Sequence, residues 1–217
     1  MSLSRRLYSN VEPGRPARQQ LRKALLSWRE SMPSDQNHAL TQRIGQHLVL
    51  MLAQHLESAA INSTSGKQQP LCIGVFWPIR GEPDLQKYYQ DLTDLGFILA
   101  LPFIKTPLNT SQSNRYLTYA KWATGQPTVT GKFAIEQPAS ITEVIPDLIL
   151  APCVGFDKNG YRLGYGAGYF DQTLKIRPTN TFGIAFAPTE VDDLHPSPSD
   201  VRLNAILTES GVHYFSD

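Results

Sequence analysis

The residue types that could carry out chemistry gather in one segment, from Pro146 to Gln172. An apolar run at 148–154 passes into a turn-rich stretch that holds Arg162 and Asp171. The same stretch contains Gly160, Gly164, Gly166, Gly168, Tyr165, Tyr169 and Phe170. A strand that delivers a glycine-rich loop to a helix start can hold phosphate, because backbone N–H groups and the helix dipole face the anion. With an arginine for charge and an aspartate for a metal ion, the segment predicts a nucleotide site.

The glycine pattern alone leaves a second interpretation open. Glycines at 164, 166 and 168 also suit a strand-to-helix turn that has no ligand, since glycine adopts conformations that other residues avoid. The spacing is not the dinucleotide G-x-G-x-x-G, and Asp157 precedes the glycines instead of following them. No G-x-x-x-x-G-K-[ST] sequence occurs, so a P-loop nucleotide hydrolase is disfavoured.

A basic stripe runs along the helix predicted at 18–32. Arg18, Arg22 and Arg29 fall within about 40° of each other on a helical wheel that advances about 100° per residue. The stripe borders the apolar face of the helix, so it lies at the edge of a packed surface. It could contact phosphate, or it could be a solvated face whose side chains cover apolar surface.

Acidic residues follow two of the predicted strands. Glu82 comes after the apolar run 71–77, and it is either a ligand or an exposed turn acid. Asp192, Asp193 and Asp200 lie in a predicted loop, where each could bind a hard cation or simply form a turn.

Composition limits the class of protein. The chain has 217 residues, 41% of them hydrophobic and 18% charged, which fits one globular domain. A net charge of +1 does not favour binding to nucleic acid or to an anionic membrane.

The five histidines form no i, i+4 pair, so zinc is disfavoured. Cys72 and Cys153 stand in apolar runs as small hydrophobes, without a C-x-x-C pair, which predicts a cytoplasmic protein. No apolar run reaches membrane-spanning length.

The order of elements predicts an α/β fold, a single-domain Rossmann-like sheet with flanking helices and an antiparallel excursion. Residues 1–17 are expected to be a tail, and 18–217 the domain. Helices are predicted at 18–32, 34–59, 84–95 and from Gly168 onward, and strands at 71–77, 97–104, 148–154, 181–187 and 205–208. The alternating 115–122 is assigned to the excursion, 58–70 to a polar linker and surface loop, and 111–114 and 188–199 to loops. Ligands should lie beyond the carboxyl ends of the strands.

One long motif resembles a known family. Phe156-Asp157-Lys158-x-Gly160-x-Arg162-Leu163-Gly164-x-Gly166-x-Gly168-Tyr169-Phe170-Asp171 is similar to the signature of the 5-formyltetrahydrofolate cyclo-ligase family. Arg18 to Arg22 looks like the N-terminal basic helix of that family, and Phe76 to Glu82 like its strand-loop-glutamate element. Gly183 to Phe186, Asp200 and 207–212 look like its C-terminal part. The resemblance covers about residues 18 to 212.

The resemblance implies an enzyme that uses ATP and Mg²⁺ to convert 5-formyltetrahydrofolate into 5,10-methenyltetrahydrofolate, with release of ADP and phosphate. By position it implies catalytic roles for Arg162, Tyr169 and Asp171, and Mg²⁺ binding by Asp171 and Asp200. The implied ATP site comprises Arg18, Arg22, Arg162, Leu163, Gly164, Tyr165, Gly166, Ala167, Gly168, Tyr169 and Phe170. The implied folate site comprises Glu82 at the pterin end and Trp77, Tyr169 and Phe170 as aromatic walls. The expected partners are these small molecules, with no nucleic acid and no membrane, and a monomer is expected.

Five positions depart from the family pattern. Phe170 replaces a frequent tyrosine, Gln172 a frequent arginine and Thr189 a frequent glutamine, while His195 and Ser197 replace a Pro-x-Glu. Two alternatives therefore stay open beside the cyclo-ligase. One is a non-catalytic folate-binding module, and the other is a protein similar to sugar-phosphate isomerases or CoA-transferases.

Overall fold

The computed structural model describes residues 15–62, 70–105 and 116–215. Its α-helices are α2 (Arg15–Glu30), α3 (Ser34–Asn62), α4 (Gln86–Asp94) and α5 (Tyr169–Ile176). Its strands are β1 (Cys72–Gly74), β2 (Ile98–Phe103), β3 (Thr118–Lys121), β4 (Thr128–Thr130), β5 (Glu136–Pro138), β6 (Glu143–Val144), β7 (Leu148–Pro152), β8 (Gly155–Asp157), β9 (Arg162–Leu163), β10 (Asn180–Ile184), β11 (Glu190–Val191), β12 (Ala205–Thr208) and β13 (Gly211–Tyr214). Two short 3₁₀ turns, η1 (Lys132–Ala134) and η2 (Ala187–Thr189), complete the described elements.

An eight-stranded sheet in the order β13-β12-β10-β7-β1-β2-β3-β6 forms the centre. Strands β12, β10, β7, β1 and β2 are parallel to their neighbours within this group. Strands β3 and β6 extend one edge antiparallel, and β13 pairs antiparallel with β12 at the other edge. The predicted α/β class and its antiparallel excursion are confirmed.

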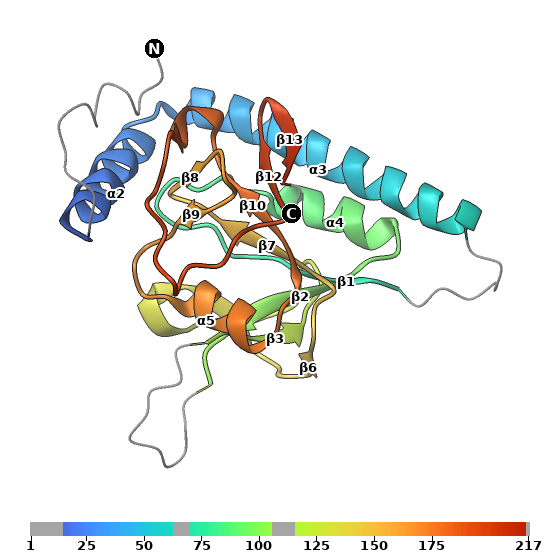
Figure 1. The fold of residues 1–217 in the computed structure, drawn as a ribbon. Coiled ribbons are helices and arrows are strands. Elements are labelled where there is room, and N and C mark those ends of the chain that lie inside the picture. Colours follow the sequence, from blue (N-terminus) through green and yellow to red (C-terminus); the bar gives the residue numbers. More distant parts are fainter. Residues whose placement is uncertain (1–14, 63–69, 106–115, 216–217) are drawn as a thin grey trace.

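Helices cover both faces of this sheet (Figure 1). Helices α3 and α4 lie across one face and α5 lies on the other, while α2 lies beside β8 and β9. The largest apolar cluster fills the space under α3 and α4, with Ile44, Leu48, Tyr89 and Leu92 buried against strand residues. A smaller cluster that contains Tyr119 and Leu174 lies under α5. Two separate layers of core therefore hold the sheet.

Helix α2 packs against a second, three-stranded sheet in the order β11-β8-β9. Its apolar stripe places Leu21 and Leu25 against Leu163 and Val191, all of them buried. Burying one leucine side chain contributes about 1.5–3 kcal/mol, so this stripe anchors the helix firmly. The arginines that border the stripe are thereby held over the glycine-rich segment.

The carboxyl ends of β1 and β7 lie side by side at the middle of the sheet. From β1 the chain proceeds to β2 on one side, and from β7 it proceeds to β10 on the other. Such a reversal leaves a crevice beyond the strand ends, where ligands bind in open α/β sheets. The segment after β1 carries Glu82, and the segment after β7 carries the glycines. The topology thus brings two distant motifs to one place.

Several predicted boundaries are wrong near the chain ends and loops. Helix α2 begins at Arg15, inside the predicted 1–17 tail, and 1–14 lie outside the described residues. It ends at Glu30, two residues early, because Pro33 disfavours helix at the residue before it. Helix α3 continues to Asn62, into the span predicted as a polar linker.

The predicted strands are too long and some short strands are missed. Strand β1 ends at Gly74, although the apolar run continues to 77, and β7 ends at Pro152. The predicted loop 188–199 contains β11, which pairs with β8. Strands of two or three residues carry no periodic pattern, so only tertiary pairing defines them. Of the predicted loops, 111–114 lies outside the described residues.

The two cysteines behave as predicted. Both are free and buried, and burial raises the pKa of Cys72 to about 11 and that of Cys153 to about 12. Neither is a ready thiolate nucleophile, which confirms their assignment as small hydrophobes. In the part of the chain that the structure describes, no helix combines the length and apolar character needed to cross a bilayer.

Candidate functional site

The glycine-rich segment is held by a hairpin of β8 and β9. The buried Asp157 binds this hairpin together, because its Oδ1 accepts the backbone N–H of Asn159 and Tyr161 at 3.0 and 2.9 Å. Its Oδ2 accepts the N–H of Leu194 at 3.1 Å, which ties in the loop that follows η2. Asp157 therefore shapes the segment that ends in the glycines, and sequence reasoning assigned it no role of its own.

The glycines then turn the chain into α5. Gly166 and Gly168 have φ of 94° and 76°, a left-handed conformation that other residues adopt at a cost. Gly168 is the N-cap of α5 and leaves the first turn without a side-chain cap. The N–H groups at such a helix start are free for an anion. Gly166 and Ala167 are exposed, so the turn is open to a ligand.

Arg22 and Arg162 bring positive charge to this turn. Arg22 Nε donates to the carbonyl oxygen of Gly164 at 2.6 Å. A Cβ added at Gly166 would lie 3.3 Å from Arg22 Cζ, so the glycine permits this close approach. The buried Arg162 lies with Cζ 5.1 Å from the centre of the Phe170 ring. The predicted arginine, glycine and helix-start groups are thus brought together.

The two predicted metal ligands are each paired with an arginine. Asp171 Oδ1 lies 3.0 Å from Arg162 Nη2, and Asp200 Oδ2 lies 2.6 Å from Arg18 Nη1. Burial tends to raise the pKa of Asp200, but hydrogen bonds from Arg18 and from the N–H and hydroxyl of Ser197 lower it below its usual value. The setting of Asp200 therefore favours its charged form.

Asp171 also contacts the backbone next to Asp200. The N–H of Val201, next to Asp200 in the chain, donates to Asp171 Oδ1 at 3.4 Å. Their side chains are 20% and 14% exposed. Among the described residues there is no group of three metal-ligating side chains. Mg²⁺ commonly uses one or two carboxylates together with phosphate oxygens, so this pair fits Mg²⁺ bound with a nucleotide.

Glu82 is buried, at 4% exposure, and the interpretation of an exposed turn acid is wrong. Its Oε1 accepts the hydroxyl of Tyr165 at 2.7 Å, and its Oε2 accepts the N–H of Ile79 at 3.0 Å. Burial raises the pKa of Glu82, and the charge of Arg29, 3.9 Å away, opposes this rise. The contact between Tyr165 and Glu82 joins the glycine-rich segment to the loop after β1.

Arg29 differs from the other two arginines of the predicted stripe, because its contacts are structural. It shares the predicted stripe with Arg18 and Arg22, but it is 2% exposed. It donates to the carbonyl oxygens of Arg80 at 2.9 Å and Cys153 at 3.2 Å, and to the hydroxyl of Tyr165. The sequence signal for its burial is its position seven residues after Arg22, near the C-terminal end of the apolar face of the helix.

The predicted aromatic walls lie in different places. Trp77 is half-buried and packs edge-on against Trp122, with ring centres 6.3 Å apart. Tyr169 packs edge-on against Phe133 at 5.9 Å, and its hydroxyl accepts a hydrogen bond from Lys132 at 3.0 Å. In the described residues Trp77 makes no ring contact with Tyr169 or Phe170. The three side chains are therefore not one stacked wall.

The residues that depart from the family pattern have structural contacts of their own. Thr189 is buried, and its hydroxyl donates to the carbonyl oxygen of Phe186 at 2.7 Å. His195 adopts a φ of 48° beside Asp193, and Gln172 is exposed on α5. Ser197 supports Asp200, as described above. The altered loop is thus an ordered support for the phosphate side of the site.

A pocket of about 490 Å³ opens behind the Glu82 network. Its lining comes from the end of α2, the start of α3 and the loop before α4, and comprises Arg29, Glu30, Met32, Ser34, Asn37, His38, Thr41, Arg80, Gly81, Asp84 and Lys87. Its lining includes no residue of the glycine-rich segment 160–168, and neither Asp171 nor Asp200. The functional assignment therefore rests on the contacts at the strand ends and not on this pocket.

The amino-acid sequence is similar to those of known proteins over most of its length. The 5-formyltetrahydrofolate cyclo-ligase of Haemophilus influenzae is 27% identical over 198 residues, which cover 88% of this chain and 96% of that protein. The mouse 5-formyltetrahydrofolate cyclo-ligase is 27% identical over 152 residues, covering 63% and 72% of the two chains.

Solved structures show the same fold. The 5,10-methenyltetrahydrofolate synthetase of Aquifex aeolicus superposes with a TM-score of 0.70 at 23% identity, covering 92% of this chain and 93% of that one. The corresponding enzyme of Mycoplasma pneumoniae gives a TM-score of 0.63, covering 88% and 98%. The model of the 5-formyltetrahydrofolate cyclo-ligase family matches residues 15–209, nearly the whole described chain. The chain therefore belongs to the 5-formyltetrahydrofolate cyclo-ligase family.

Proposed function

We propose that this protein uses ATP and Mg²⁺ to convert 5-formyltetrahydrofolate into 5,10-methenyltetrahydrofolate, releasing ADP and phosphate. One observation supports this most directly. Helix α2 contacts the glycine-rich segment through Arg22 at one end, and the Glu82 network through Arg29 at the other. An anion-binding turn and a buried carboxylate are thus held by one rigid element at the point where the sheet reverses.

The proposed chemistry explains why a phosphate site and a folate site must adjoin. The formyl oxygen of the substrate is a poor leaving group, so it first attacks the γ-phosphorus of ATP. An O–P bond forms, the bond to ADP breaks, and an iminium phosphate results at N5. N10 then attacks the activated carbon and loses its proton, a C–N bond forms, and the C–O bond breaks to release phosphate.

The phosphate end is proposed to work by position and charge, which are the main requirements of phosphoryl transfer. Arg18, Arg22 and Arg162 would bind phosphate oxygens, together with the open turn 163–170. Arg162 is buried and Arg22 is already fixed to the backbone of the turn. Because Arg22 is already held over the turn, it would need little reorganisation when charge develops on the transferred group.

Asp171 and Asp200 are the residues proposed to hold Mg²⁺. When bound, the ion would neutralise charge on the phosphates. In the free protein the guanidinium groups of Arg162 and Arg18 lie against these two carboxylates. We propose that the arginines keep both side chains in place, and that they turn to phosphate when the carboxylates contact the metal.

The folate end is proposed to use Glu82 for hydrogen bonds to the pterin ring. Its carboxylate is oriented by Tyr165 and by the N–H of Ile79. Tyr169 and Phe170 would contact the ring system nearest the phosphate, and Trp77 would contact it from the side of β1. Because the three aromatic side chains are separate in the free protein, we propose that ligand binding brings them around one molecule.

The test is a turnover assay with the pure protein. It is incubated with 5-formyltetrahydrofolate and Mg²⁺, with and without ATP, and the near-ultraviolet absorbance of the methenyl product is followed. We expect a signal that requires both ATP and Mg²⁺. Folate binding without turnover would instead support the non-catalytic module, and absence of both would contradict the proposal.

The expected partners and setting remain part of this proposal. Only small molecules are needed for the reaction, and we propose a monomer in the cytoplasm without a nucleic-acid partner. Size-exclusion chromatography with light scattering checks the monomer directly. A mass of about twice the 24.2 kDa chain would contradict it.

A further inference from the structure

Three buried polar atoms lack hydrogen-bond partners in the part of the chain that the structure describes. They are the hydroxyl of Tyr119 and the Nε and Nη2 atoms of Arg162. Arg162 Nη2 is 3.0 Å from Asp171 Oδ1, so it has an ion pair but no well-directed hydrogen bond. Buried polar groups are nearly always paired, so a cluster of unpaired ones indicates something that completes it.

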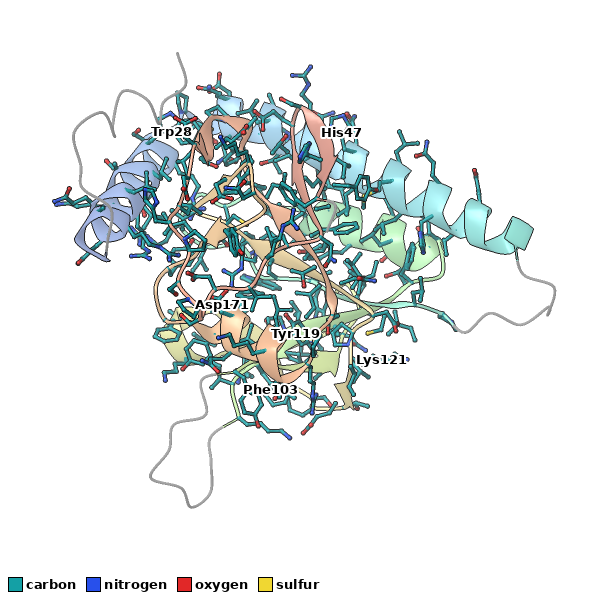
Figure 2. The ribbon with its side chains drawn as sticks, viewed as in Figure 1. Trp28, His47, Phe103, Tyr119, Lys121 and Asp171 are labelled. Carbon is teal, nitrogen blue, oxygen red and sulfur yellow. The ribbon has the colours of Figure 1, made fainter. Side chains whose placement is uncertain are left out.

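Tyr119 and Arg162 come from different elements and are connected through Phe170. Tyr119 is on β3 and packs in the apolar cluster that Phe170 also contacts, and the ring of Phe170 lies under the Arg162 guanidinium. The start of this strand is tied to α5, because the N–H of Leu117 donates to the Thr173 hydroxyl at 2.7 Å. Figure 2 shows Tyr119 and Asp171 on the α5 side of the sheet.

The electrostatics agree with this proximity. Burial raises the pKa of Tyr119 far above its usual value, and the charge of Arg162 is the one group that acts in the opposite direction. The tyrosine therefore keeps its proton, and its hydroxyl is a hydrogen-bond donor. The protonated hydroxyl and the unsatisfied guanidinium N–H groups are donors that an added acceptor would satisfy.

Tyr89 is a buried tyrosine whose hydroxyl does have a hydrogen-bond partner, and it serves as a comparison for Tyr119. It is also a fully buried tyrosine, on the opposite face of the sheet, and its hydroxyl donates to the carbonyl oxygen of Phe76 at 2.7 Å. Burial raises its pKa in the same way. Within the described residues, one buried tyrosine hydroxyl is thus satisfied and the other has no hydrogen-bond partner.

We propose that Tyr119 is a further substrate-binding residue, whose hydroxyl donates, together with Arg162, to a phosphate oxygen of the nucleotide. This inference rests on the proposed function. An anionic oxygen is a ligand that fits, because it accepts several hydrogen bonds at once and its charge complements the guanidinium. The half-buried ring of Phe170 covers the guanidinium in the free protein, so it must shift when the oxygen binds.

The test compares Tyr119→Phe with Tyr89→Phe as the matched control. Each substitution removes one buried hydroxyl and keeps the ring. Tyr119→Phe should lower kcat/KM for ATP by about tenfold or more, the effect of one lost hydrogen bond to a charged group. Its KM for 5-formyltetrahydrofolate should change less than twofold, and its Tm should stay equal or rise, since an unpaired group is removed. Tyr89→Phe should lower Tm and leave the ATP kinetics unchanged.

A second measurement separates this inference from the proposed function. The Tm of each protein is recorded with inorganic phosphate and with chloride at equal ionic strength. We expect phosphate to raise the Tm of the wild type and of Tyr89→Phe, and to raise that of Tyr119→Phe less. If the wild type shows no ATP-dependent turnover, the proposed function fails, and this phosphate effect alone decides the role of Tyr119.

Two outcomes overturn the assignment of Tyr119. The first is that Tyr119→Phe keeps the ATP kinetics or the phosphate effect of the wild type. If its Tm also falls, a buried water satisfies the hydroxyl. The second is a rise in the folate KM alone, which would place the hydroxyl at the folate and not at the phosphate.

Discussion

The two ends of α2 use the same residue type in opposite ways. Near its start, the side chain of Arg18 is 19% exposed and pairs with a carboxylate that is 14% exposed. Near its end, Arg29 and Glu82 are each 1% exposed in their side chains, and Arg29 donates three hydrogen bonds. The helical spacing is alike, so along α2 burial and not sequence position separates Arg18, which we propose binds a ligand, from Arg29, which is structural.

This difference predicts how each end responds to change. Ion pairs near the surface contribute about 0–1 kcal/mol, so their partners can be exchanged for metal and phosphate at little cost. Breaking a buried pair costs about 3–5 kcal/mol, because a charge is left without compensation. The phosphate end is therefore suited to rearrange on binding, and the Glu82 end is suited to hold one geometry.

The largest expected effect is on stability, from Glu82→Ala. The substitution leaves Arg29 buried without its carboxylate and removes the acceptor of the Tyr165 hydroxyl. We expect the free energy of unfolding to fall by about 3 kcal/mol or more, measured by urea denaturation at pH 8.

The matched control is Glu30→Ala. Glu30 accepts a hydrogen bond from Arg80 at 2.5 Å, but both side chains are more than 40% exposed. We expect a much smaller loss than in Glu82→Ala, because solvent screens an exposed ion pair. Equal losses in the two variants would contradict the distinction between the two kinds of pair.

The next effect is on catalysis, from Asp171→Asn. The amide keeps the shape of the side chain but removes the charge proposed to bind Mg²⁺. We expect kcat to fall by about 100-fold or more, and Tm to fall less than in Glu82→Ala, because Asp171 is 20% exposed and a neutral amide of the same shape still faces Arg162. The exposed Asp91→Asn on α4 is the control and should behave as the wild type. Near-normal turnover of Asp171→Asn at saturating Mg²⁺ would remove Asp171 from the metal site.

A smaller effect is expected from Arg18→Ala. Loss of a charged hydrogen bond to phosphate should raise the KM for ATP by about tenfold and leave the folate KM unchanged. Lys23→Ala removes one positive charge from an exposed position of the same helix and controls for long-range charge. A rise in the folate KM alone would show that the start of α2 faces the folate.

The sequence was informative where a local pattern and a tertiary role coincide. The apolar stripe of α2, the strand before the glycines and the helix after Gly168 all have a period or a turn residue that can be read directly. The roles of Arg22, Arg162, Asp171 and Asp200 were predicted through the resemblance and stay predictions; the structure pairs Arg162 with Asp171 and fixes Arg22 to Gly164.

The parts that could not be predicted depend on contacts between distant segments. Glu82 looks like an exposed turn acid until the loop after β1 meets Arg29 and Tyr165. The strand β11 exists only because it pairs with β8. The lack of a partner for the Tyr119 hydroxyl among the described residues is visible only once β3 and α5 are packed together. No window of local sequence contains such information, because burial of a polar group is a property of the assembled fold.

The smallest expected effect is a change of stability with pH, which tests whether Glu82 stays in one protonation state. Because burial raises the pKa of Glu82 above 4.5, the folded state binds the proton more tightly than the unfolded state. Glu82 then contributes stability that is fully present below pH 4.5 and is lost as the pH rises through its raised pKa. Glu82→Gln has no such proton, so the stability of the wild type relative to this variant should decline across that range. Urea midpoints measured from pH 4.5 upward check this. A constant difference would mean that Arg29 offsets burial completely, and that Glu82 titrates as an ordinary carboxylate despite its position.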